Sequence, residues 1–254
     1  MGLVSMPLNA SEIPRSIRFD SPTFAEENER PGRRQSGGSR CSCLRGSIVA
    51  LLPENGWGLT IDSRPDFIVY IPPLWAIETE SVTLKNAPNV DGWRMQKGGG
   101  STDTFIIEFV LMDVEDEDNR NVVYQTTFES DEFPGLMQLS LPETTPPLVV
   151  GNRYMWFLSL ICDRDDRSGD EFMFGWLERA NPSPQLVREL AGTSEVDRAI
   201  LYAEYGLWYD AVATLATLRR SRPEDTEIAS LWRSLLFQVG LESLNDTAFV
   251  SIPD

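Results

Sequence analysis

Short apolar runs separated by turn residues fill the middle of the chain. The strongest is Arg153–Ile161, between Gly151 and Asp163, where almost every residue is aromatic or aliphatic. It has neither helix caps nor a polar stripe, so it predicts a strand buried on both faces. A second run, residues 172–177, follows a polar loop that contains Gly169 and predicts an antiparallel partner for this strand.

Other apolar runs at similar spacing predict the remaining strands. They lie at residues 47–52, 57–61, 67–71, 104–112, 122–128 and 135–141. With the hairpin they give about seven antiparallel strands, spaced as in a β-sandwich. Leu148, Gly151 and Tyr154 have the spacing of a tyrosine corner, in which a Tyr hydroxyl bonds to backbone just upstream. We therefore predict an immunoglobulin-like sandwich, although Trp156 stands where antibody domains have a Cys.

After Pro182 the apolar spacing becomes helical. Residues 194–206, 208–220 and 226–244 predict three helices, with Gly206 and Pro223 as stop signals. Residues 1–40 are instead rich in Arg, Ser, Pro, Gly and acids and show no periodicity. We therefore predict a disordered leader over 1–40, a sandwich over 41–181 and a helical tail over 182–254.

The charge balance excludes several functions. Lys and Arg number 22 against 39 Asp and Glu, and with no His the formal net charge is −17. This charge repels phosphate backbones and anionic lipid, so we expect neither nucleic-acid nor membrane binding, and it favours divalent cations or basic partners. The absence of His removes His-dependent triads and His metal ligands. No GxSxG, Walker or dinucleotide-binding pattern is present, so we expect no enzyme and no organic cofactor.

The polar loop of the predicted hairpin carries a cluster of carboxylates. Its candidate metal ligands are Asp163, Asp165, Asp166 and Asp170. Clustered carboxylates are what a hard cation needs, although Gly169 lies one position too late for an EF-hand. The other interpretation is a solvated acidic turn.

Aromatic residues mark two candidate docking sites. Trp75 and Trp93 lie in a long connection that should emerge at the same end of the sandwich as the acidic loop, where binding sites are usually built. They suit a carbohydrate or a basic peptide, unless both rings fold back over the core. Tyr205, Trp208 and Tyr209 mark a groove on the helices where a protein partner would dock.

The helical tail resembles a tetratricopeptide repeat. The residues at the spacing of that repeat are Ala199, Tyr202, Gly206, Trp208, Ala211, Leu215, Leu218 and Pro223. The match covers one repeat and a capping helix, and it departs at Glu195 and Arg198, where the repeat usually has Trp and Leu. Such repeats bury a core only by stacking, so a single copy must pack on the sandwich or on another protein.

The body of the chain is similar to a family known as domain of unknown function 928, common in cyanobacteria. The similar motifs lie at residues 31–34, 51–53, 58–60, 64–65, 123–128, 151–154, 159–163, 175–176 and 201–218. The resemblance implies an exported, non-membrane protein of unassigned activity. Residues 1–10 could then be the end of a longer signal peptide or simply a disordered terminus.

The same resemblance bears on the cysteines. Cys43 and Cys162 match two positions of the family, which implies a disulfide and an oxidising compartment. It would close a loop of roughly 120 residues, worth up to about 4 to 5 kcal/mol on the chain-entropy model. Cys41 could replace Cys43 as the partner, and three free thiols in a cytosolic protein are the alternative.

These observations predict a non-catalytic protein-binding or scaffold module outside the cytoplasm. Two alternatives stay open. One is a carbohydrate-active or cation-dependent enzyme that uses the loop carboxylates. The other is a structural subunit of an envelope assembly.

Overall fold

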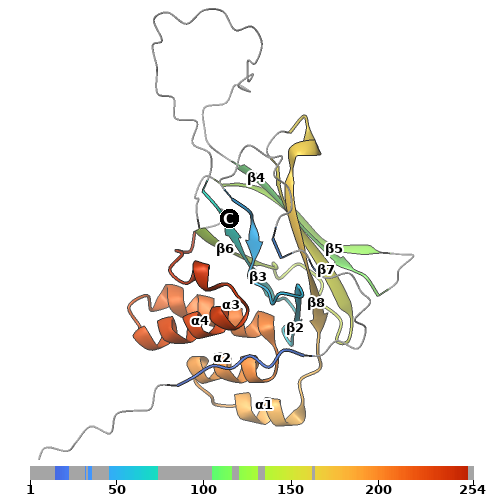
Figure 1. Cartoon of the computed structure of the whole chain (residues 1–254). Coiled ribbons are helices and arrows are strands. Elements are labelled where there is room, and N and C mark those ends of the chain that lie inside the picture. Colours follow the sequence, from blue (N-terminus) through green and yellow to red (C-terminus); the bar gives the residue numbers. More distant parts are fainter. Residues whose placement is uncertain are drawn as a thin grey trace, which may run out of the picture.

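The computed structural model describes residues 15–22, 32, 34–35, 46–73, 105–115, 120–130, 135–161 and 164–250. These residues form two β-sheets and a layer of helices below them (Figure 1). The strands are β1 (Val49–Ala50), β2 (Trp57–Thr60), β3 (Asp66–Ile71), β4 (Phe105–Asp113), β5 (Asn121–Ser130), β6 (Gly135–Ser140), β7 (Arg153–Ile161) and β8 (Glu171–Arg179). The predicted β-rich body with a helical tail is therefore confirmed.

The larger sheet has the strand order β2-β8-β7-β4-β5, so β7 lies at its centre. Its pairs are antiparallel except β2 with β8, which is parallel, where only antiparallel pairs were expected. The prediction that β7 is buried on both faces is wrong. Tyr154, Trp156 and Leu158 are buried, but on the other face only Met155 is buried, and Phe157 is half-buried and packs against Phe174 of β8.

The smaller sheet has the order β1-β3-β6 and packs on the larger one through aromatic rings. Phe67 of β3 lies 4.9 Å from the ring of Phe109 in β4 and 5.2 Å from that of Trp156 in β7. The backbone N–H of Val149 donates to the Tyr154 hydroxyl at 2.7 Å, which is the contact that a tyrosine corner requires. The core of the β body thus lies between the two sheets.

Four helices follow the sheets: α1 (Pro184–Leu190), α2 (Glu195–Glu204), α3 (Trp208–Ser221) and α4 (Thr226–Gln238). Ser183, Ser194 and Asp225 cap the first, second and fourth by accepting from backbone N–H groups in the first turn. Gly206 separates α2 from α3 with φ +73°, a conformation that glycine adopts readily. Two short 3-10 helices are also present, at Arg167–Gly169 and Glu242–Leu244.

The helices and the sheets share one hydrophobic core. Trp208 and Tyr209 at the start of α3 are fully buried within the cluster that also contains residues of both sheets. The Trp208 indole donates to the Leu51 carbonyl at 2.7 Å, and the Trp156 indole donates to the Tyr209 hydroxyl at 2.7 Å. A boundary near residue 182 therefore separates strands from helices in the sequence, but no break in packing accompanies it.

Part of the predicted leader is ordered, which corrects the prediction of disorder over 1–40. Residues 15–22 run in extended form over the helices, and Ile17 is buried (Figure 1). Gln35 forms an isolated bridge with Val49, and the Arg34 guanidinium donates to the carbonyl of Leu52. The few apolar residues of this stretch are enough to dock it, because the folded body offers a complementary surface.

Candidate functional site

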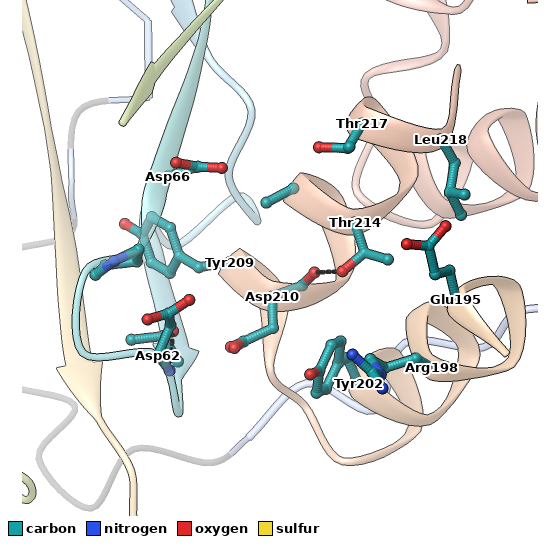
Figure 2. Close-up of a pocket in the computed structure, with 13 residues that line it drawn as sticks. Asp62, Asp66, Glu195, Arg198, Tyr202, Tyr209, Asp210, Thr214, Thr217 and Leu218 are labelled. Atoms are coloured by element: carbon teal, nitrogen blue, oxygen red, sulfur yellow. Dashed lines mark hydrogen bonds between the residues drawn. The ribbon is translucent and has the colours of Figure 1, made fainter. Parts of the chain in front are cut away.

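A cavity of about 250 Å³ opens where the turn between β2 and β3 meets α2 and α3 (Figure 2). Its walls combine polar and apolar surface in similar amounts. The charged or phenolic side chains that line it are Asp62, Asp66, Glu195, Arg198, Tyr202, Tyr209 and Asp210, and the hydroxyl side chains are Thr60, Thr214 and Thr217. Because it lies between strands and helices, the cavity exists only when both parts are docked.

Backbone turns and helix starts place the four carboxylates. Asp62 follows β2, and its carboxylate accepts from the Arg64 backbone N–H at 3.0 Å. Asp66 begins β3, and its carboxylate accepts from the Gln138 amide at 2.6 Å. Glu195 and Asp210 lie in the first turns of α2 and α3, where the helix dipole favours negative charge. The β2–β3 connection, α2 and α3 therefore bring acidic side chains around one space, as Figure 2 shows.

Asp210 is the most enclosed of these carboxyl groups. It accepts from the Ile61 backbone N–H at 3.1 Å and is hydrogen-bonded to the Thr60 side chain. Burial raises its pKa to about 7, against the opposing effect of those hydrogen bonds. Asp210 therefore fastens the end of β2 to α3, and its charge depends on pH in the neutral range.

The cavity carries an excess of negative charge. Arg198 is the one cationic side chain among the described residues that line it, against the carboxylates of Asp62, Asp66 and Glu195 and the partly protonated Asp210. Its Nε is buried and has no hydrogen-bond partner in the part of the chain that the structure describes. Burial, followed by the charge of Asp210, raises the pKa of the nearby Tyr202 hydroxyl. The arrangement suits a ligand with a positive group.

The aromatic residues that the sequence predicted as docking sites differ in how far they are buried. Trp208 and Tyr209 are buried, so their rings pack the junction between helices and sheets and do not form the exposed helical groove that the sequence predicted. Tyr205 is half-buried, and its hydroxyl donates to Glu189 at 2.8 Å. Trp75 and Trp93 lie outside the described residues.

The described carboxylates of the predicted metal loop are used in other ways. Asp166 caps a 3-10 turn, and hydrogen bonds from the Ser168 side chain and then from the Ser168 backbone N–H, at 3.0 Å, lower its pKa. Asp170 is paired with Arg167, while Asp165 is exposed. Asp163 lies outside the described residues. Within the described part of the chain, no three His, Cys, Asp or Glu side chains gather as a metal site would require. Cys41, Cys43 and Cys162 also lie outside it.

Sequence reasoning did not find the cavity. Asp62, Asp66, Glu195 and Asp210 carry no shared motif and are spread over about 150 positions of the chain. The one local signal was Asp210, an acid directly after Trp208 and Tyr209 at the start of a predicted helix. Finding the cluster needs the docking of α3 on β2, which is a tertiary contact.

Comparison with known proteins gives one match. A family model described as Domain of Unknown Function (DUF928) matches residues 29–249, which is most of the chain. No curated protein and no solved structure matches the sequence. No helix in the described residues has the length and apolar composition needed to cross a membrane.

Proposed function

We propose that this chain, which belongs to the DUF928 family, is a non-catalytic binding module that takes a basic side chain of a protein partner in the cavity between the β2–β3 turn, α2 and α3. The observation that carries the proposal is that four acidic side chains, two from the β2–β3 turn and the start of β3 and one each from α2 and α3, line a space with a single guanidinium among the described residues (Figure 2). A partner that brings a Lys or Arg balances this charge.

The size and the chemistry of the cavity fit such a side chain. A volume of about 250 Å³ admits one long side chain but no large ring system. Hydrogen bonds between an ammonium or guanidinium and carboxylates are shorter and about twice as strong as neutral ones. The net charge of −17 also attracts a basic partner from a distance, which raises the association rate at low salt.

Binding of a synthetic peptide tests the proposal. A lysine-rich peptide should bind the full chain in calorimetric titration, and its acetylated form should not, because acetylation removes the charge. Asp62→Asn with Glu195→Gln should weaken binding by about three- to tenfold, as expected for partly exposed charge pairs. Glu143→Gln is the matched control, since Glu143 is exposed on a turn outside the cavity. Equal loss in the control, or no loss in the double variant, contradicts the proposal.

One observation favours a second function, that of a carbohydrate-active enzyme. A carboxyl with a pKa of about 7 beside other carboxylates resembles the acid and base of a glycoside hydrolase. The contacts of Asp210 oppose this, because its oxygens already accept from Ile61 and Thr60. Hydrolysis of model glycosides by the wild-type chain, abolished in Asp210→Asn, would replace the binding proposal.

For the fold, we propose that the two sheets form an immunoglobulin-like sandwich and that α2 and α3 form one tetratricopeptide-like unit. The tyrosine-corner hydrogen bond from Val149 to Tyr154 supports the first assignment. The second is supported by Ala199, Ala203 and Ala211, which are fully buried, as expected where small residues let two helices approach closely.

For the compartment, we propose an extracytoplasmic location with a Cys43–Cys162 disulfide. Support comes from the family resemblance in the sequence. Thiol labelling of the denatured, non-reduced protein tests it: one of the three cysteines should react, and reaction of all three excludes the disulfide and removes most of the support for this location.

A further inference from the structure

Residues 15–22 lie across the helices as a bound peptide would. Figure 1 shows this segment, in dark blue, crossing the helical layer in an extended path. In the sequence it reads Arg-Ser-Ile-Arg-Phe-Asp-Ser-Pro. The surface beneath it is formed by α2, α4 and the start of α3, and we call this surface the leader groove; its polar contacts are Asp197, Ala203, Glu227, Ser234 and Gln238.

The groove binds the backbone of the segment through hydrogen bonds. The Phe19 N–H donates to the Gln238 side chain at 2.9 Å, and the Gln238 amide donates back to the Ile17 carbonyl at 3.2 Å. The Asp20 N–H donates to the Ala203 carbonyl at 3.1 Å. Contacts of this kind hold any extended peptide in place, whatever its side chains.

Three side chains of the segment supply specificity. The Arg15 guanidinium bonds to Asp197 at 2.7 Å and forms two bonds with Glu227, at 2.5 Å and 3.0 Å. Ile17 is 3% exposed, and Phe19 places its ring edge-on to Trp208 with centroids 4.9 Å apart. A bidentate pair between Arg and a carboxylate has a fixed geometry and therefore favours Arg at this position. Alternate side chains of an extended peptide point to the same side, so residues 15, 17 and 19 can all face the groove. The pattern that the groove selects is thus Arg-x-aliphatic-x-aromatic.

We propose that the leader groove is a peptide-binding site for an extended Arg-x-aliphatic-x-aromatic segment of a partner protein, which competes with the chain's own residues 15–22. The chain's own segment shows the bound pose, and the two acids at one end select the basic residue. The acidic charge of the whole chain favours such a partner further. This site is separate from the cavity, whose lining does not include the groove residues.

The test uses a labelled peptide with the sequence of residues 15–22 and the full chain. In Arg15→Glu the chain's own segment loses its ion pairs with Asp197 and Glu227 and meets like charges. The peptide should therefore bind this variant at least tenfold more tightly than the wild type, where the tethered segment has an effective concentration in the millimolar range. Arg18→Glu is the matched control: Arg18 is 80% exposed and pairs only with Asp20 of the same segment among the described residues, so this variant should behave as the wild type.

A second measurement does not depend on any variant. An excess of unlabelled peptide should speed hydrogen exchange at the amides of Phe19 and Asp20 in the wild-type chain, because displacement frees both donors. Unchanged exchange together with equal peptide affinity for wild type and Arg15→Glu overturns the proposal. Equal binding of a peptide in which Ala replaces the first Arg and the Phe also overturns it, as does a dimer formed by exchange of this segment between two copies.

Discussion

The five-stranded sheet and the junction between sheets and helices both contain many aromatic residues, but different hydrogen bonds hold them together. In the sheet, backbone ladders join the strands, and the inward-facing rings mainly pack against one another. At the junction, side chains hold the elements: Trp208 bonds to Leu51, Tyr209 bonds to Trp156 and to the Trp176 carbonyl, and Asp210 bonds to Ile61. The sheet is therefore specified by local sequence, whereas the junction, with the cavity beside it, depends on a few particular atoms.

The largest effect is expected from removing a ring at the junction. Trp208→Ala should lower the free energy of unfolding by about 3 to 5 kcal/mol, since it deletes a fully buried ring. Because the core is shared, circular dichroism and fluorescence should report a single urea transition. Phe237→Ala is the control, because Phe237 is 71% exposed and should be nearly neutral. Two separate transitions would mean that the helices are an independent appendage.

A pH-dependent effect should distinguish the junction from the sheet. The pKa of Asp210 is raised from 3.8 to about 7 in the folded chain, so the folded state holds a proton that the unfolded state releases. Protonation of Asp210 therefore contributes to the free energy of unfolding. This contribution is complete below pH 4 and is lost as pH rises to about 7, at about 1.4 kcal/mol for each unit by which the pKa is raised. Asp210→Asn cannot ionise, so it should gain stability relative to the wild type between pH 4.5 and 7.5. Urea titrations at both pH values measure this difference, and a constant difference contradicts it.

A smaller effect should follow from removing one hydroxyl. Tyr209→Phe keeps the ring but leaves the Trp156 indole N–H and the Trp176 carbonyl without this partner. We expect a loss of about 1 to 3 kcal/mol, the cost of stranding buried polar groups. Tyr205→Phe removes a hydroxyl from the surface contact with Glu189 and should leave the urea midpoint unchanged. Equal effects of the two substitutions would show that the junction is held by packing alone.

Sequence patterns predicted the elements of both regions well, because each element is a local apolar run. The family assignment, drawn from motifs, is confirmed by the match over residues 29–249. The parallel β2–β8 pair was missed, since strands far apart in sequence carry no sign of their partner. The docked residues 15–22 were missed because Ile17 and Phe19 stand alone in a polar stretch. Their burial depends on a surface that the rest of the chain must first build.

The candidate site was less accessible to sequence reasoning than the fold. The acidic loop was predicted as a metal site because its carboxylates are adjacent in sequence. In the structure its described carboxylates are exposed or hydrogen-bonded within the loop. Asp62 and Asp66 are close in sequence, but Glu195 and Asp210 lie on the helices and join them only after docking. Among the cavity acids, Asp62 and Glu195 are exposed and Asp210 is the most enclosed, so the enclosure of an acid depends on its tertiary contacts.

The most direct test of the binding proposal is a nuclear magnetic resonance titration of the full chain with the lysine-rich peptide. We predict that amide signals shift around Asp62, Glu195 and Asp210 and that the acetylated peptide produces no shifts. Shifts confined to residues 164–170, or none anywhere at saturating peptide, would contradict the assignment of the cavity as the binding site.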